Sequence, residues 1–129
     1  MIVNILPFVP LLPFNNFFFQ FNPVEEMTDL KTRDGQKISS AFYKSKTDTR
    51  SLVLLLHMLG RSKEDWIDFA KRLTDKYNVL AIDFRGHGDS DGALENFGKS
   101  DFEKFQLDIE CARDYIEKII KDGIIKMGA

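Results

Sequence analysis

Ala81-Ile82-Asp83-Phe84-Arg85-Gly86-His87-Gly88-Asp89-Ser90-Asp91-Gly92 is the stretch that decides the fold of this chain. It completes an apolar run that starts at Asn78, and then brings three glycines within seven residues, separated by polar and charged side chains. Because glycine tolerates positive φ and close backbone approach, this pattern predicts a buried strand that ends in an irregular loop. Open α/β sheets place their sites in such loops, at the carboxyl ends of parallel strands.

The residues before this loop predict a strand, a helix and a second strand. Ser51–His57 holds a continuous apolar run without alternation, which is typical of a parallel strand covered on both faces. Ser62 and Asp65 match a capping box, and the helix that they start would run to Tyr77. One apolar stripe along that helix is formed by Trp66, Phe69, Ala70 and Leu73. With the strand Val79–Asp83 these elements make a βαβ unit, whose crossover should be right-handed.

A β-hairpin is predicted ahead of this unit. Thr28–Thr32 and Lys37–Tyr43 are short β-prone runs on either side of Asp34-Gly35, a dipeptide typical of tight hairpin turns.

A long helix is predicted after the glycine loop. Ser100 and Glu103 form a second capping box, and Asp122-Gly123 supplies the glycine that commonly ends a helix. The apolar residues that recur every three or four positions between them are Phe102, Phe105, Ile109, Ala112, Ile116 and Ile119. Ile124–Met127 then begins a third strand of the β/α alternation, two residues before the sequence ends at Gly128-Ala129.

Composition indicates one globular domain with a separate N-terminal segment. The 129 residues carry 29% charged side chains and a net charge of −2, with no basic stripe, so we expect no nucleic-acid partner. The single cysteine, Cys111, excludes an internal disulfide and a cysteine-rich zinc site, and is interpreted as a small core residue.

Residues 1–23 carry no charge and hold all four prolines, which sets them apart from an expected domain over residues 24–129. This apolar leader, rich in proline and phenylalanine, has the length of a membrane span. However, Pro7, Pro10 and Pro13 favour an extended path, and a secretory signal would need a cationic start. We therefore expect a cytoplasmic protein, with membrane contact through residues 1–23 as the alternative.

Several residues carry chemistry, but none completes a motif by itself. His57 and His87 both follow strands, and two histidines alone cannot complete a zinc site, so we predict no metal and no cofactor. Asp83 is interpreted as a loop cap that accepts backbone N–H groups, with a general base or a metal ligand as alternatives. Gly86 and Gly88 begin a dinucleotide fingerprint whose third glycine is replaced, which leaves nucleotide binding as a minor hypothesis.

Three motifs in series give the chain a family resemblance. They are a strand that ends in His57-Met58-Leu59-Gly60, a helix that carries Trp66, and a strand that ends in Asp83-Phe84-Arg85-Gly86-His87-Gly88-Asp89-Ser90. This series resembles the N-terminal half of an α/β-hydrolase, on the serine-aminopeptidase-like and lysophospholipase-like branch. The fold it implies is a partial α/β-hydrolase: an N-terminal hairpin, then β-α-β-α-β with a mostly parallel sheet.

The resemblance also implies roles for the two loops. Backbone N–H groups of Met58 and Leu59 would belong to an oxyanion hole. The residues of a structural loop beside the site would be Asp83, Arg85, Gly86, His87, Gly88 and Ser90, so that His87 is not the catalytic histidine. In this family the nucleophile sits in a G-x-S-x-G elbow after the next strand, and Gly128-Ala129 fits its first two positions.

The sequence printed here ends before the serine, the acid and the histidine of such a triad. We therefore expect ester or amide hydrolysis by the family, a small-molecule ester or amide as substrate if the domain is completed, and no activity from these residues alone. Two alternatives stay open. One is a non-catalytic binding or assembly module, completed by another chain or by self-association at an exposed sheet edge. The other is a small nucleotide-binding Rossmann-like domain.

Overall fold

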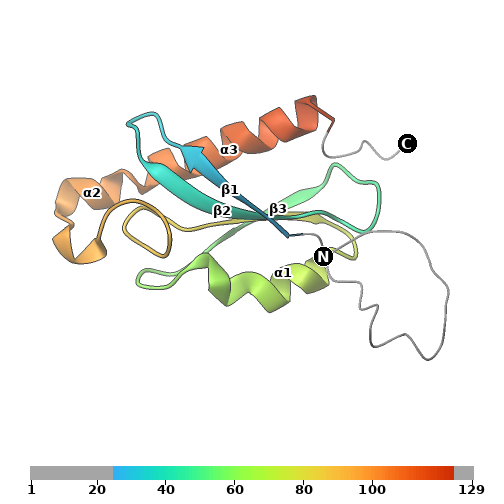
Figure 1. The fold of residues 1–129 in the computed structure, drawn as a ribbon, viewed down its shortest axis with the longest axis horizontal. Coiled ribbons are helices and arrows are strands. Elements are labelled where there is room, and N and C mark those ends of the chain that lie inside the picture. The colour runs from blue at the N-terminus through green and yellow to red at the C-terminus, as the bar shows by residue number, and fades with distance from the viewer. Residues whose placement is uncertain (1–24, 124–129) are drawn as a thin grey trace.

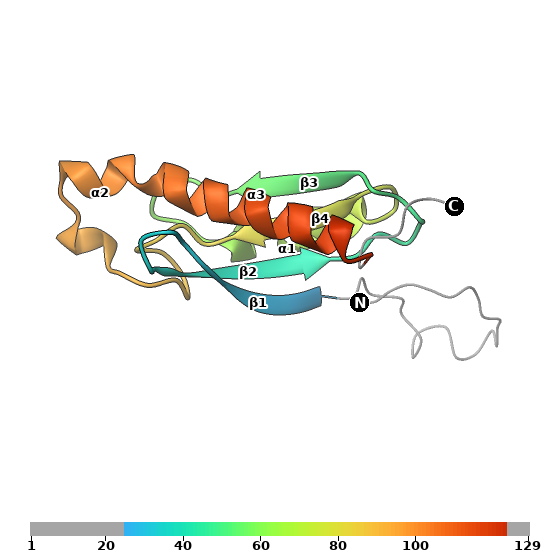
Figure 2. The same cartoon turned by 90° about the horizontal axis from the view of Figure 1, so that it is seen from above.

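The computed structural model describes residues 25–123, and they form three layers. A four-stranded sheet in the order β1-β2-β4-β3 lies in the middle, with α3 on one face and α1 on the other (Figure 1). Viewed from above, α3 runs along the sheet, and residues 94–103, which end in α2, extend beyond the end of the sheet (Figure 2).

The predicted hairpin is confirmed, with a longer turn than its sequence suggests. β1 (Glu25–Lys31) and β2 (Lys37–Tyr43) pair antiparallel, so that Thr28 faces Ser40. The connection spans residues 32–36, and the C=O of Thr32 accepts the N–H of Gly35 at 2.9 Å. Gly35 has φ +89°, which explains the glycine, but the turn is not a two-residue one.

The predicted βαβ unit is present. β3 (Leu52–Leu56) and β4 (Asn78–Ile82) pair in parallel, and β4 also pairs antiparallel with β2. Within residues 25–123 the parallel part of the sheet is therefore the β3–β4 pair, to which the hairpin adds antiparallel pairs. Every residue of β4 is buried, as its continuous apolar run predicted for a central strand.

Side-chain alternation divides the core into two halves. The α3 face packs a first cluster whose buried members are Leu30, Ile38, Phe42, Leu80, Ile82, Cys111, Ala112 and Ile119. The α1 face packs a second, smaller one of Ala41, Tyr43, Leu55, Ala70, Val79 and Ala81. Cys111 is thus the small core residue that was predicted, and burial raises the pKa of its thiol to about 11.

The helix after β3 differs from its prediction at both ends. It begins as a 3₁₀ turn, η2 (Lys63–Trp66), and continues as α1 (Ile67–Leu73), so it ends before Tyr77. Ser62 does cap it by accepting the N–H of Glu64, but Asp65 does not close the capping box. Its carboxylate pairs with the Arg61 guanidinium at 2.7 and 2.9 Å instead.

The single long helix predicted after the glycine loop is wrong, because the helix is broken at Lys104. η3 (Leu94–Asn96) and α2 (Lys99–Glu103) come before α3 (Phe105–Lys121). The cap is also misplaced in the prediction: Gly98 is the N-cap, and its N–H donates to Asp101 Oδ2 at 2.8 Å. The end is as predicted, since Gly123 has φ +78° just after α3.

The predicted leader 1–23, the strand Ile124–Met127 and the Gly128-Ala129 end lie outside the described residues. Among the helices within residues 25–123, none has the length and apolarity needed to cross a membrane.

Candidate active site

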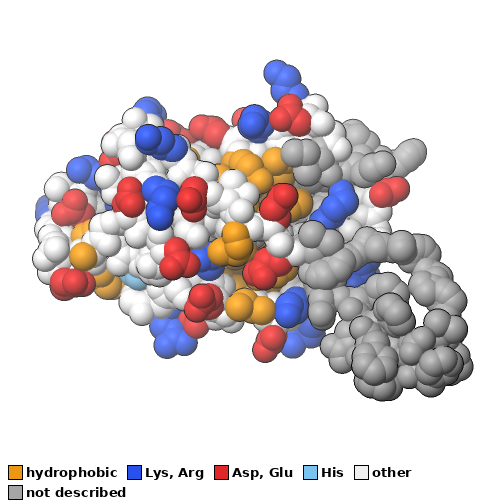
Figure 3. Space-filling view, viewed as in Figure 1, with side chains coloured by type: hydrophobic (Ala, Val, Ile, Leu, Met, Phe, Trp, Pro, Cys, Tyr) orange, Lys and Arg blue, Asp and Glu red, His pale blue; other side chains and the backbone are white. Residues whose placement is uncertain are grey.

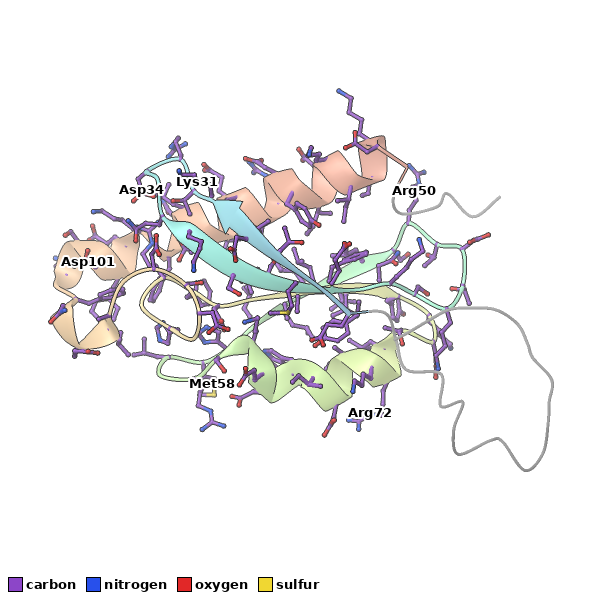
Figure 4. The ribbon with its side chains drawn as sticks, in the orientation of Figure 1. Lys31, Asp34, Arg50, Met58, Arg72 and Asp101 are labelled. Carbon is purple, nitrogen blue, oxygen red and sulfur yellow. The ribbon has the colours of Figure 1, made fainter. Side chains whose placement is uncertain are left out.

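The loops after β3 and β4 lie next to each other at one end of the sheet. The rings of His57 and His87 have their centroids 4.8 Å apart, as expected for residues at the carboxyl ends of adjacent parallel strands. Figure 4 shows Met58 at this end of the molecule, on the loop that leads to α1 and pointing away from the sheet.

Asp83 organises the glycine loop by accepting backbone N–H groups. Its carboxylate is fully buried and accepts the N–H of Lys63 at 2.7 Å, the Nζ of Lys63 at 2.8 Å and the N–H of Asp89 at 3.0 Å. Burial alone would lower the pKa of Lys63, but its hydrogen bond to Asp83 holds that pKa above its ordinary value. Asp83 is therefore a structural anion with all its partners inside the protein, not a free base.

Two glycines of the loop leave room for neighbouring side chains. Gly88 has φ +50°, and a Cβ at this position would overlap the carboxylate of Asp83. Gly86 has φ +78°, and a Cβ there would overlap the ring of Phe97. A phosphate cradle needs the same backbone freedom, but here a carboxylate fills the loop and would repel an anion. The geometry argues against the nucleotide alternative.

Arg85 ties the loop to the hairpin and to α3. Its Nε donates to Asp108 Oδ1 and its N–H to Asp108 Oδ2, both at 2.9 Å, while Nη1 and Nη2 donate to Asp34 at 2.8 and 3.0 Å. The hydrogen bond from Arg85, and a second from Thr32, hold the pKa of Asp34 well below its ordinary value. Asp108 is fully buried and was not among the site residues predicted from the sequence. The available signal was its place between Phe105 and Ala112, on the apolar side of the helix.

Ser90 is a structural hydroxyl and not a nucleophile. Its Oγ donates to the C=O of Asp83 at 2.6 Å and accepts the N–H of Ser39 at 2.8 Å, which joins the loop to β2.

The two histidines are held by backbone groups. Nε2 of His57 accepts the N–H of Phe84 at 3.0 Å, and Nε2 of His87 accepts the N–H of Gly60 at 2.9 Å. Their Nδ1 atoms face the C=O of Met58 and of Arg85. No serine or cysteine of residues 25–123 makes a hydrogen bond to either ring, and burial lowers the pKa of His57.

Met58 and Leu59 form an exposed turn at the end of β3. Their side chains are 78% and 61% exposed, and Gly60 beyond them has φ +80°. The turn is closed by the N–H of Arg61, which donates to the C=O of Met58 at 2.9 Å. The N–H of Leu59 makes no hydrogen bond within residues 25–123.

Residues 25–123 hold no cluster of metal ligands, and the face shown in Figure 3 holds no basic surface for nucleic acid. No three histidine, cysteine or acidic side chains among residues 25–123 come together as a metal site. On the face seen in Figure 3, acidic and basic side chains are interspersed around a central group of hydrophobic ones. A basic surface for nucleic acid does not form there.

A family model described as "alpha/beta hydrolase fold" matches residues 51–120, which is more than half of the chain. The chain belongs to the α/β-hydrolase fold family. The search of curated proteins gave no match.

Solved structures agree on the fold. An esterase from Pyrococcus furiosus is 24% identical with a TM-score of 0.59, over 74% of this chain and 36% of its own. An esterase from Exiguobacterium antarcticum is 22% identical with a TM-score of 0.59, over 71% and 32%. A haloalkane dehalogenase from Agrobacterium tumefaciens is 21% identical with a TM-score of 0.57, over 72% and 29%. The chain thus spans about a third of these proteins, and the fold alone does not select the reaction.

Proposed function

We propose that this chain forms the N-terminal portion of a serine hydrolase domain that cleaves esters or amides, and that Leu59, with Met58, supplies N–H groups to its oxyanion hole. The observation that supports this most is the exposed turn at the end of β3, where the Leu59 N–H has no acceptor within residues 25–123. A donor held by the fold and left unpaired is what a developing oxyanion requires.

Topology supports the position of this turn beside a nucleophile. The crossover from β3 to β4 uses α1 on one face of the sheet, whereas α3 follows β4 on the opposite face (Figure 1). A right-handed crossover on the opposite face moves the chain back across the sheet, so a parallel strand after α3 would lie beside β3. Its carboxyl end would then adjoin Met58-Leu59, at the point where strand order reverses and α/β sheets bind ligands.

The described residues lack a catalytic pair of their own. The Nε2 atoms of His57 and His87 each accept a backbone N–H already. Neither ring can take a proton from a hydroxyl at Nε2 without breaking that hydrogen bond. We therefore propose that the 129-residue polypeptide is inactive. It would be incubated with a chromogenic short-chain ester, with no turnover above background expected. Turnover that a serine-directed phosphonate abolishes would refute this inactivity.

The role of Leu59 is tested in a longer protein. The test uses a protein in which this chain is joined to the C-terminal part of a family member, which supplies a G-x-S-x-G elbow, an acid and a histidine. In that protein, Leu59→Pro removes the N–H donor, and kcat should fall by about 10²–10³-fold. Leu59→Ala keeps the donor and should retain kcat within a few-fold. Equal losses in both variants, or no loss in Leu59→Pro, would exclude a role for this N–H.

A second candidate function, an assembly module completed by another chain, is favoured by the position of β3 at the edge of the sheet that residues 25–123 form. The Asn78 N–H donates to the C=O of Ser51, and Leu52 is the residue paired with Asn78. In a regular parallel ladder the backbone groups of Leu52, Leu54 and Leu56 therefore point to the open edge. This edge carries no charge within Leu52–Leu56, and an apolar edge of that kind is a template for pairing.

A further inference from the structure

We propose that His57 and His87 are positioning residues, a pair of neutral imidazoles that clamp the Met58–Gly60 turn and release it when they are protonated. The clamp itself follows from the geometry of the described residues. Its consequence for an oxyanion hole rests on the proposed function.

The backbone partners fix the protonation state of both rings. A backbone N–H can only donate, so the N–H groups of Phe84 and Gly60 require a lone pair on the Nε2 of His57 and of His87. The proton of each neutral ring then sits on Nδ1, where a backbone C=O lies at 2.7 Å from His57 and 3.0 Å from His87. Each imidazole thus links two loops only in its neutral form with the proton on Nδ1.

The bond to His87 is what holds the turn to its neighbour. Among residues 25–123, the hydrogen bond from Gly60 to His87 is the one that joins residues 58–60 to the glycine loop. His57 adds a second link, because its Nδ1 faces the C=O of Met58 and its Nε2 binds the N–H of Phe84. Leu59 lies between these two anchored positions, so its N–H direction depends on both rings.

Protonation would turn both links into contacts between donors. An N–H on the Nε2 of His87 would point at the N–H of Gly60, and the same would occur between His57 and Phe84. The two rings are 4.8 Å apart, so a charge on one also opposes a charge on the other.

The charged groups around the pair are already engaged with one another. Asp65 pairs with Arg61, Asp83 with Lys63, and Asp89 with Lys63 at 3.3 Å. Arg85 is held by Asp34 and Asp108 on its far side. The other rings in contact are those of Phe84 and Phe105, which are uncharged. Burial holds the pKa of His57 below its ordinary value and outweighs Asp83 and Asp65, which favour a charge on that ring.

The test is nitrogen NMR on the 129-residue chain, which needs no enzymatic activity and so can fail independently of the proposed function. At pH 8, two-bond ¹⁵N spectra should show both rings with the proton on Nδ1. On titration to pH 5, the Gly60 and Phe84 amide signals should move together with the ring nitrogens. Hydrogen exchange of the Gly60 N–H, corrected for intrinsic pH dependence, should rise by roughly tenfold, the scale of one lost hydrogen bond. The Asp91 N–H, which donates to Lys37, is the control and should keep its protection.

A matched variant separates the clamp from general loosening. His87→Gln offers an uncharged acceptor that does not titrate. In this variant the amide signal and exchange rate of Gly60 should lose their pH dependence, while the amide signal of Phe84 should keep its own. The proton on Nε2 of either ring at pH 8, or full protection of Gly60 after His87 is protonated, would overturn the proposal. Because these two outcomes are read on the unmodified chain, the test stands even if the variant does not fold.

Discussion

At the scale of single residues, Gly88 shows how one missing side chain organises a loop. Its backbone lies against the Asp83 carboxylate, and that carboxylate binds the backbone of Asp89 and both nitrogen atoms of Lys63. A methyl group at residue 88 would displace a buried anion from three hydrogen bonds. The glycine is therefore required by a packing contact as well as by its positive φ.

Gly88→Ala is expected to destabilise the chain more than Gly35→Ala. Both glycines have positive φ, so both variants lose about 1–2 kcal/mol to backbone strain. A Cβ at residue 35 would meet nothing within 4 Å, whereas one at residue 88 would disturb hydrogen bonds to a buried charge. Gly88→Ala should thus cost at least about 2 kcal/mol more in the free energy of unfolding, measured by urea titration. Equal losses would mean that the Asp83 contact contributes nothing.

At the scale of elements, α3 is joined to the glycine loop by an ion pair and packs on the sheet with its apolar stripe. Asp108 lies in the first turn of α3, on its buried face, and the backbone and guanidinium of Arg85 both bind it. The pair is buried on both sides, with side chains 6% and 0% exposed, so neither partner can turn to water if the other is removed.

Asp108→Asn should lower the free energy of unfolding by about 3 kcal/mol. This is the lower end of the range for removing one partner of a buried ion pair, because Arg85 keeps its second partner, Asp34. Asp114→Asn is the matched control on the same helix. The side chains of Arg113 and Asp114 are 64% and 63% exposed. Losing this ion pair should therefore change the free energy of unfolding by no more than about 0.5 kcal/mol. Urea unfolding of the two variants gives the comparison, and similar values for both would contradict a special role for Asp108.

Asp108 also marks the limit of what the sequence could predict about these elements. Apolar periodicity placed the strands and the inner face of α3, because burial repeats with the period of each element. Periodicity also places Asp108 on that face, but it could not identify the partner of this carboxylate, since Arg85 is distant in sequence. The predicted capping boxes failed because other groups compete for the same positions. Arg61 binds the carboxylate of Asp65, and Gly98 with Asp101 caps α2 in place of Ser100 with Glu103. Local pattern does not rank such competitors.

The glycine loop was predicted in part. Its residue types predicted an irregular loop at the end of a buried strand, while its structural role was implied by the family resemblance. Its partners outside the loop, Lys63 for Asp83 and Phe97 for Gly86, were not predicted, because local sequence does not show them. The orientation of the two histidines was beyond sequence reasoning, since it depends on backbone N–H groups from the neighbouring loop.

At the scale of the whole molecule, the two edges of the described sheet differ in chemistry. β1 carries Glu25, Glu26, Asp29 and Lys31, and charges on an edge strand discourage pairing with another sheet. β3 offers Leu52–Leu56 with no charge, and most of its side chains are only half-buried. Within residues 25–123, the sheet is protected against association at β1 and open to it at β3.

The 129-residue polypeptide should therefore associate through β3. Sedimentation velocity from about 5 to 200 μM should show growth in mass with concentration, the range in which exposed strand edges cause association. Apolar strand pairing should persist in about 0.5 M NaCl, whereas association through the charged β1 edge would be screened at that ionic strength. A chain that lacks residues 1–23 is the control, because the cluster Phe17–Phe21 could also cause association. If association disappears with the leader or with salt, β3 is not the interface. A compact monomer at every concentration would remove the observation behind the assembly-module candidate.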